Sequence, residues 1–341
     1  MSRRYPARAV GLAAVAVIGL GLAACSSSGS GSPTSSSSGS SSSGGSSFSK
    51  NNLELVLGTK SDDFYVTMQC GAEAEAKKLG AKLTVNGPAD FSASEQAPIL
   101  NAVVATKPDA LIVAPTDAKA LDPELNRIQN AGTKIIFVDT SSSSTSLGVS
   151  RISTDNVGGG KVAADNLGKQ IGGKGTVAVI NVNPGISTTD ARIQGFQAEM
   201  KAKYPNVKVL GTQYDNDSAA TAASQVSSDI SAHPNLSGVF ATNVLSAQGA
   251  ATGVQHAGKT GKVKVATFDA EPQQITFLKS NTIQLAVAQD PYQEGIDGVQ
   301  QALNAANGKT VTKNIGTPLV AITKANVNSP SVQKYIYKDS C

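Results

Sequence analysis

Polar side chains recur in this sequence where short apolar segments end. Asp139 follows KIIFV, Asp269 follows KVATF and Gln289 follows LAVA, while Asn243 comes directly after GVFAT. Carboxylates accept hydrogen bonds and amides both donate and accept them, so a group of such side chains can bind a polar solute. In open α/β sheets, ligands bind beyond the carboxyl ends of the strands. We therefore expect these side chains to face a polar cleft.

Carboxylates at strand ends could also perform acid–base chemistry, but no catalytic motif accompanies them. The sequence contains no HExxH, GxSxG or paired CxxC motif. Residues 253–260, GVQHAGKT, match the phosphate-loop pattern, but they close a predicted helix before a strand. A phosphate loop needs the reverse order, strand before helix. We expect no enzyme activity, no metal and no cofactor.

From residue 53 onward, short apolar segments alternate with amphipathic segments of helical length. LELVLGT, KLTVN, ALIVAP and KIIFVD are predicted strands of a first unit. TVAVIN, KVLGTQ, GVFATN, KVKVATFD and IQLAVAQ are predicted strands of a second unit, followed by an extended PLVAIT. This alternation predicts an α/β fold with two doubly wound parallel-sheet units, separated by a break near residues 150–156.

The N-terminal segment predicts export and a membrane anchor. Residues 1–24 combine three early arginines with an apolar stretch, as a signal peptide does. Leu22-Ala23-Ala24-Cys25 resembles the lipobox of bacterial lipoproteins, in which cleavage precedes a cysteine whose thiol is diacylated. Residues 25–49 would then be the lipidated Cys25 and a flexible Ser/Gly tether. We expect a lipid-anchored protein on the extracytoplasmic face of the cell membrane; the alternative is an uncleaved membrane anchor.

Charge and cysteine content narrow the choice of partner and compartment. The chain has 29 basic and 25 acidic residues, and the signal peptide accounts for three of the arginines. Such a balance does not favour nucleic-acid binding, which usually needs a clustered basic face. Export permits a disulfide, and we predict one between Cys70 and Cys341, although their positions show no spacing signature. The alternative is a buried Cys70 and a free Cys341 thiol.

A set of motifs in fixed order points to a known family. Leu53 to about Val327 resembles the ribose-type (type I, class B) periplasmic binding proteins, the solute receptors of ABC sugar importers. The motifs that carry this resemblance are Phe64-Tyr65-Val66, Ala114-Pro115-Thr116-Asp117, Thr154-Asp155-Asn156, Ala191-Arg192-Ile193-Gln194-Gly195-Phe196, Val239-Phe240-Ala241-Thr242-Asn243 and Thr267-Phe268-Asp269.

The resemblance implies a periplasmic-binding-protein type I fold, with two lobes joined by a three-stranded hinge. The expected N-terminal lobe comprises residues 50–154 and 290–318, and the expected C-terminal lobe comprises 155–289 and 319–341. Hinge closure would capture a sugar, and the closed monomer would deliver it to the membrane subunits of an ABC permease. The alternatives are a sugar-sensing co-receptor of a membrane signalling protein and a secreted sugar-modifying enzyme. A repressor-type role would need a DNA-binding segment that this chain does not show.

The resemblance also assigns roles to individual residues. Phe64 and Tyr65 match an aromatic pair that stacks on the sugar, and Arg192 matches a forked donor. Four further matches are polar residues of the site: Asp139, Asn243, Asp269 and Gln289. The sequence departs from the ribose pattern at four positions: Asp62 for an asparagine, Ala114 for an asparagine, Thr140 for an arginine and Asn216 for an aromatic residue. These changes add an acid and remove a cation, so we expect the ligand to be a neutral sugar or polyol other than ribose.

Overall fold

The computed structural model describes residues 48–341. The predicted signal peptide, Cys25 and all but the last two residues of the predicted tether lie outside the described residues. Within residues 48–341, no helix combines the length and the apolar character needed to cross a bilayer.

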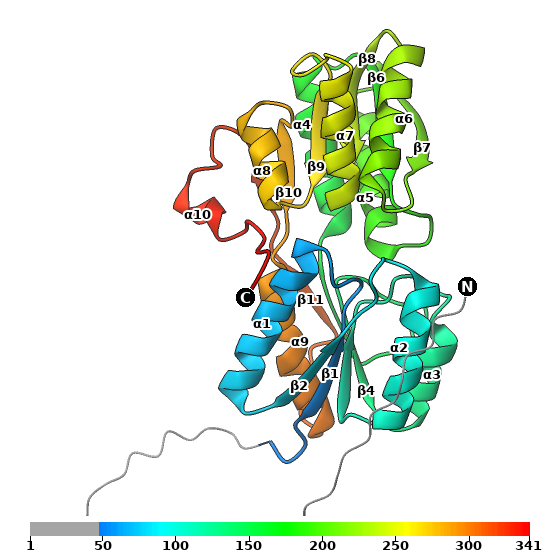
Figure 1. Ribbon diagram of the computed structural model, residues 1–341, viewed down its shortest axis with the longest axis vertical. Coiled ribbons are helices and arrows are strands. Elements are labelled where there is room, and N and C mark those ends of the chain that lie inside the picture. The colour runs from blue at the N-terminus through cyan, green and yellow to red at the C-terminus, as the bar shows by residue number, and fades with distance from the viewer. Residues whose placement is uncertain (1–47) are drawn as a thin grey trace, which may run out of the picture. The chain divides into compact units, whose positions relative to one another are not determined.

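The first of two six-stranded sheets has the order β11-β5-β4-β3-β1-β2, and all its neighbouring strands are parallel. Its strands are β1 (Asn52–Val56), β2 (Lys82–Asn86), β3 (Ala110–Val113), β4 (Lys134–Val138), β5 (Ser150–Thr154) and β11 (Asn314–Thr317). Helices α1 (Asp63–Leu79) and α9 (Pro291–Ala306) pack on one face, and α2 (Ala93–Thr106) and α3 (Asp122–Asn130) on the other (Figure 1). Because both faces are covered, β3 is an uninterrupted buried run. We call this sheet and its helices the N-lobe.

The second sheet has the order β12-β10-β9-β8-β6-β7, and its edge strand β12 runs antiparallel to β10. Its strands are β6 (Gly175–Asn181), β7 (Val207–Tyr214), β8 (Leu236–Ala241), β9 (Lys264–Phe268), β10 (Leu285–Ala288) and β12 (Val320–Ile322). Helices α4 (Asn156–Gln170) and α5 (Ser187–Lys203) pack together on one face. The other face carries α6 (Ala219–Ala232), α7 (Val244–His256) and α8 (Pro272–Lys279) (Figure 1). We call this sheet and its helices the C-lobe.

The chain passes between the two sheets three times. It leaves β5 of the N-lobe for α4, leaves β10 of the C-lobe for α9, and leaves β11 for β12. The predicted α/β class, with two doubly wound sheets and a three-stranded hinge, is confirmed. Sequence patterning did not identify β5 and β11 as strands. Both lie towards one edge of their sheet, and β5 alternates buried and half-buried residues instead of forming an apolar run.

The C-terminal segment returns from the C-lobe to the N-lobe. After β12 it forms the short α10 (Pro330–Gln333) and then reaches α1, where a disulfide joins Cys341 to Cys70 with an S–S distance of 2.03 Å. The last residues of the chain, expected in the C-terminal lobe, thus end on the N-lobe.

Candidate functional site

A cavity lies where the carboxyl ends of the two sheets face each other. The empty space of this cavity, counted together with its opening to solvent, is about 420 Å³. The N-lobe contributes side chains from the start of α1, the loop before α2 and the end of β4. The C-lobe contributes the start of α5 and the ends of β6, β7, β8, β9 and β10. The lining residues are Asp62, Phe64, Tyr65, Phe91, Asp139, Val182, Ile186, Thr188, Thr189, Arg192, Asp217, Asn243, Asp269 and Gln289.

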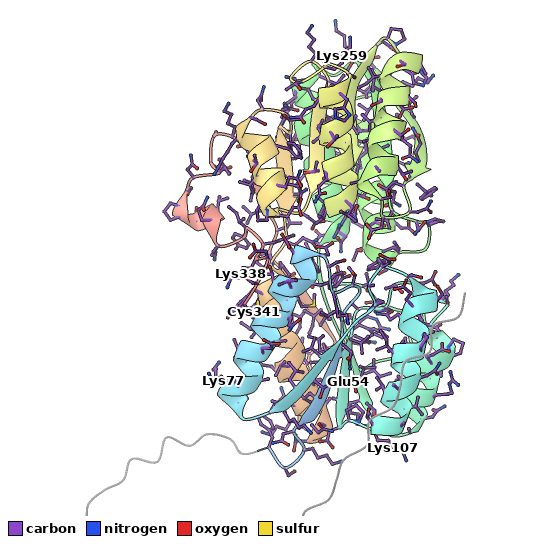
Figure 2. All side chains as sticks on the ribbon, viewed as in Figure 1. Glu54, Lys77, Lys107, Lys259, Lys338 and Cys341 are labelled. Carbon is purple, nitrogen blue, oxygen red and sulfur yellow. A yellow bond between two sulfur atoms is a disulfide. The ribbon has the colours of Figure 1, made fainter. Side chains whose placement is uncertain are left out.

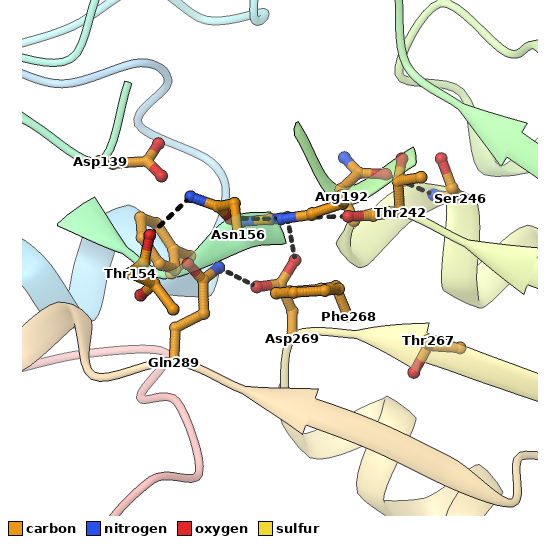
Figure 3. Close-up of polar contacts among 12 residues, drawn as sticks. Asp139, Thr154, Asn156, Arg192, Thr242, Ser246, Thr267, Phe268, Asp269 and Gln289 are labelled. Carbon is orange, nitrogen blue, oxygen red and sulfur yellow. Dashed lines mark hydrogen bonds and ion pairs between the residues drawn. The ribbon is translucent and has the colours of Figure 1, made fainter. Parts of the chain in front are cut away.

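Arg192, on the second turn of α5, is the positively charged member of this lining. Its side chain is 3% exposed and lies 4.0 Å from the centre of the Phe268 ring. Nε donates to Asn156 Oδ1 at 2.7 Å, and Nη1 donates to the Thr242 carbonyl oxygen at 2.7 Å (Figure 3). These bonds hold the guanidinium on two sides, and Nη2 makes no hydrogen bond to the described residues. The guanidinium is therefore held in one orientation, and its Nη2 remains available as a hydrogen-bond donor.

Asp269 follows β9 directly and is held by partners from both sides. Its Oδ1 accepts from Gln289 Nε2 at 2.7 Å and from the Tyr337 hydroxyl at 2.9 Å. Its Oδ2 lies 3.8 Å from Arg192 Nη1 (Figure 3). Burial raises the pKa of Asp269, and the nearby guanidinium opposes that rise. Oδ2 remains available as an acceptor toward the cavity.

Asp139 takes the corresponding place after β4 in the N-lobe. Its Oδ2 accepts from the Tyr65 hydroxyl at 2.7 Å, while Oδ1 has no hydrogen bond to the described residues. Burial raises the pKa of Asp139 to about 6, and the positive charge of Arg192 limits the rise. Asp139 and Asp269 have φ angles of 56° and 73°, in the left-handed region that residues other than glycine seldom adopt. Such backbone strain clusters at functional sites.

Asp62 caps α1, because its Oδ1 accepts from the Phe64 backbone N–H at 2.8 Å. Its other oxygen accepts no hydrogen bond from residues 48–341. The pKa of Asp62 lies well above its ordinary range; burial between the lobes is the main cause, and the negative charge of Asp269 is the second. Counting Asp217, the cavity lining holds four carboxyl groups and a single guanidinium. The site is therefore rich in hydrogen-bond acceptors and poor in positive charge.

An aromatic wall covers the N-lobe side of the cavity. Phe64 meets the edge of Tyr65 with a centroid distance of 5.1 Å, and Tyr65 stacks on Phe91 at 6.2 Å. Phe64 also meets Tyr337 of the C-terminal segment at 5.6 Å. Aromatic faces pack well against the C–H faces of a ring. Phe91 was not identified from the sequence, because it lies in a loop with no strand or helix pattern to mark it.

The structure brings eight of the ten sequence-predicted site residues into the lining of this cavity. Asn216 lines an adjoining cavity at its mouth, and its neighbour Asp217 lines the central one instead. Thr140 is buried but is not part of the lining, and its hydroxyl has no partner. Asn243 bonds to Asp217 Oδ1 at 2.8 Å and caps α7, so its amide is largely occupied by protein.

Two buried polar atoms of the lining have no hydrogen-bond partner among residues 48–341. They are the Thr189 hydroxyl, which sequence reasoning missed, and Gln289 Oε1. Buried polar groups are nearly always paired, so atoms left unpaired at a cavity mark where a polar ligand binds. No cluster of three or more His, Cys, Asp or Glu residues in the described part of the chain is arranged to hold a metal ion. Together the lining can enclose a small polyhydroxylated molecule by hydrogen bonding and ring packing.

Comparison with known proteins supports that interpretation. A model of the periplasmic binding protein domain matches residues 53–310. The chain is 31% identical over 280 residues to the ribose import binding protein of Salmonella typhimurium, covering 82% of this chain and 93% of that protein. The chain belongs to the ribose-type periplasmic sugar-binding proteins of ABC importers. A second ribose import binding protein of this family, from Bacillus subtilis, is 28% identical over 277 residues, which is 80% of this chain and 88% of the relative.

Solved structures of the family match the whole described fold. An ABC transporter solute-binding protein from Agrobacterium vitis, bound with α-D-tagatopyranose, is 42% identical, with a TM-score of 0.82 over 85% of this chain and 100% of that one. A carbohydrate transporter protein from Agrobacterium radiobacter, in complex with D-arabinose, is 32% identical, with a TM-score of 0.81 over 84% and 99% of the chains. This chain is therefore a periplasmic-type sugar-binding protein with the type I fold.

Proposed function

We propose that this protein captures a neutral monosaccharide between its lobes and delivers it to an ABC import permease. The observation that carries the proposal is the composition of the cavity. Asp62, Asp139 and Asp217 each keep a free carboxyl oxygen, Arg192 keeps a free nitrogen, and Thr189 and Gln289 keep unpaired polar atoms. Sugar hydroxyls both donate and accept, so they can satisfy all three kinds of group at once.

The charge of the cavity favours a neutral ligand over a phosphorylated or acidic one. A phosphate would lie among four carboxyl groups with one guanidinium to pair with. Like charges that share a desolvated site repel strongly, so binding would require protonation of the carboxyl groups. We expect sugar phosphates and sugar acids to bind far more weakly than the parent sugars.

The relatives supply the first sugars to test. Their bound ligands are a ketohexose, tagatose, in the 42% identical structure and a pentose, arabinose, in the 32% identical one. The departures from the ribose pattern at Asp62 and Thr140 argue against ribose itself. We propose D-tagatose as the first candidate, with Asp62, Asp139, Asp217, Asp269 and Gln289 meeting its hydroxyls, Arg192 acting as forked donor, and Phe64 and Tyr65 packing on the ring.

The rest of the chain would hold and present this site. We propose that Cys25 is lipidated and that residues 26–49 tether the protein outside the membrane. We further propose lobes of residues 50–154 with 290–318 and of residues 155–289 with 319–341, although the last residues of the second lobe return to α1 of the first. β5 and β11 belong to the sheet of the N-lobe, whereas β10 and β12 belong to the sheet of the C-lobe, and this arrangement supports these boundaries. The partner would be the permease, approached by a monomer in its closed form.

A thermal-shift screen of the purified protein tests the proposal. The panel contains D-tagatose, other neutral hexoses and pentoses, polyols, and the matching sugar phosphates. A sugar at 100 times its Kd stabilises the folded state by about 2.7 kcal/mol, which raises the melting temperature by several degrees. We expect a neutral sugar to give this shift and its phosphate to give none. A shift with sugar phosphates alone, or with no member of the panel, would contradict the proposal.

A further inference from the structure

The C-terminal residues 335–341, which we call the strap, lie against ligand-facing residues of both lobes. Tyr337 is 3% exposed and sits at the centre of these contacts. Its hydroxyl donates to Asp269 Oδ1 at 2.9 Å and accepts from the Gln289 backbone N–H at 3.3 Å. Its backbone N–H donates to the Ala270 carbonyl at 3.0 Å. The strap thus reaches two of the polar residues that line the C-lobe side of the cavity.

The same tyrosine also contacts the N-lobe. Its ring meets the ring of Phe64 at 5.6 Å with an interplanar angle of 73°. One residue further on, the Lys338 backbone N–H donates to Thr67 Oγ1 at 2.7 Å, on the next turn of α1. Tyr337 therefore lies behind Asp269 and Phe64, in contact with the acceptor of one lobe and the aromatic wall of the other.

The disulfide completes the attachment. Cys341 is bonded to Cys70, on the same helix as Phe64 and Thr67, so the strap is covalently fixed at its far end (Figure 2). Its near end continues from β12 of the C-lobe through α10. Tyr337 is consequently held between a covalent bond to one lobe and hydrogen bonds to the other.

Resting on the proposed sugar-binding function, we infer that Tyr337 is a positioning residue of the sugar site and that the Cys70–Cys341 disulfide holds it in place. The tyrosine does not line the cavity. It acts through Asp269, whose Oδ1 it occupies so that Oδ2 faces Arg192 and the ligand. It acts also through Phe64, whose ring it supports from behind. Sequence reasoning could not find this role, because nothing near Tyr337 in the chain marks it.

The hydroxyl of Tyr337 stays a donor across the useful pH range, since burial and the charge of Asp269 raise its pKa well above 10.0. Its hydrogen bond stabilises the ionised form of Asp269 and so lowers the pKa of that carboxyl. The other charged or polar groups that act on Asp269 are Arg192 of α5, Gln289 after β10, the Val244 backbone N–H at the start of α7, and the acids Asp62, Asp139, Asp217 and Glu271. Removal of the hydroxyl leaves all of these in place.

The test compares Tyr337→Phe with Tyr335→Phe, a tyrosine of the same strap whose hydroxyl makes no hydrogen bond to residues 48–341, whereas that of Tyr337 bonds to Asp269 and Gln289. Two quantities are measured: the Asp269 pKa in the ligand-free protein, by ¹³C NMR with Asp269→Asn for assignment, and the Kd of the sugar found in the screen. We expect Tyr337→Phe to raise the Asp269 pKa and to weaken sugar binding about tenfold, as loss of a hydrogen bond to a charged group does. Tyr335→Phe should change neither quantity.

The disulfide is tested in the same way, by reducing the folded wild-type protein and, separately, by the double variant Cys70→Ser with Cys341→Ser. Both should shift the Asp269 pKa and the sugar affinity in the direction of Tyr337→Phe, and added reductant should not affect the double variant further. An unchanged Asp269 pKa in Tyr337→Phe, or unchanged sugar affinity despite a shifted pKa, would overturn the inference. If the wild type binds no sugar, the proposed function fails, and the Asp269 titration alone decides the role of the strap.

Discussion

The two carboxylates that follow β4 and β9 occupy equivalent positions in the two lobes. Asp139 and Asp269 each come directly after a buried strand, and both adopt left-handed φ angles. One oxygen of each carboxyl group accepts a hydrogen bond from a tyrosine hydroxyl, and we propose that the other oxygen binds the sugar. Asparagine tolerates the left-handed region better than most residues, which makes Asp→Asn the substitution that best separates charge from backbone geometry.

At the residue scale we predict that sugar affinity depends on the charge of Asp139. Burial raises its pKa to about 6. Ligand hydroxyls donate to the ionised form, so wild-type affinity should fall as the pH drops below about 6, by up to about tenfold per pH unit for one proton. Asp139→Asn should bind more weakly near neutral pH and lose less affinity on acidification. Calorimetric titrations across this pH range measure both effects; an identical acid-side loss in the variant would exclude Asp139 as the titrating group.

Some site residues could be predicted from the sequence and others could not. Asp139, Asp269 and Gln289 follow buried strands, whose apolar pattern is local and easy to detect. The sequence could not show whether Asn216 or Asp217 lines the central cavity. Both have left-handed φ angles, and only the folded turn decides which of them faces the cavity. Phe91 faces the cavity through long-range packing, which a single sequence does not reveal.

At the scale of elements, close contact between α4 and α5 fixes the position of Arg192. Gly160 of α4 lies against the Arg192 carbonyl, and Gly195 of α5 lies against the Val157 carbonyl, so a Cβ atom at either glycine would overlap that oxygen. The helices can approach this closely because glycine has no side chain. The contact places the guanidinium at the cavity, within reach of Asn156 at the start of α4.

We predict that Gly195→Ala separates the two helices and weakens the site. Overpacking of this kind costs about 1–3 kcal/mol of folding stability. Arg192 lies less than one turn away, so sugar affinity should fall as well. Gly211→Ala is the matched control, because a Cβ there meets no atom within 4 Å. Denaturant unfolding and sugar titration of both variants provide the comparison, and equal behaviour of the two would contradict the role given to the helix contact.

The hinge contains a buried acid that does not line the cavity. Glu294, near the start of α9, accepts hydrogen bonds from Thr317 at 2.9 Å and Thr154 at 3.3 Å, residues at the ends of β11 and β5. Its Oε2 has no hydrogen-bond partner in the described part of the chain. The pKa of Glu294 lies well above 4.5; burial is the main cause, and the negative charge of Asp139 is the second. The folded state therefore favours the protonated acid at the junction of the crossing segments.

We predict that Glu294→Gln stabilises the protein at alkaline pH. Because the folded-state pKa lies above the ordinary value, the wild type is favoured below about 4.5 and loses stability as the pH rises through the folded-state pKa. Glutamine has no charge to bury, so the variant escapes this loss. Thermal melts of the two proteins should diverge as the pH rises and converge in acid. Parallel curves across the pH range would show that Glu294 is ionised in the folded protein.

At the scale of the whole molecule, direct hydrogen bonds join the lobes across the cleft. The Ala118 backbone N–H donates to the Gly185 carbonyl at 3.1 Å, and the Ser141 backbone N–H donates to Ser187 Oγ at 3.0 Å. The first residue of each pair follows a strand of the N-lobe, and the second lies between β6 and the first turn of α5. These bonds form when the lobes are together, so they favour the closed form that we propose to bind the sugar.

We predict that Ser187→Ala weakens sugar binding about fivefold, the effect of losing about 1 kcal/mol from the closed form. The melting temperature of the ligand-free protein should change little, because the serine contributes little to either lobe alone. Ser228→Ala on α6, whose hydroxyl bonds within its own helix, is the control. Sugar titrations measure the effect, and equal affinities of the two variants would show that this bond does not bias closure.

The two-lobe architecture could be predicted from the sequence, because it follows from alternating buried strands and amphipathic helices. The contacts between the lobes could not, since Ser141 with Ser187 and Tyr337 with Phe64 are brought together by the folded hinge and the returning C-terminal segment. Sequence patterning detects elements whose signal is local. It does not detect which loops meet across a cleft.

The central claim is that a neutral sugar is captured in the cavity between the lobes. The most direct test is a calorimetric titration of the protein with D-tagatose and with the sugar selected by the screen, compared with the same titration of Arg192→Met. The account predicts one site per chain in the wild type and a loss of affinity of at least about a hundredfold in the variant, which leaves buried carboxylates unpaired. Equal binding by both proteins, or no binding of any neutral sugar by the wild type, would contradict it.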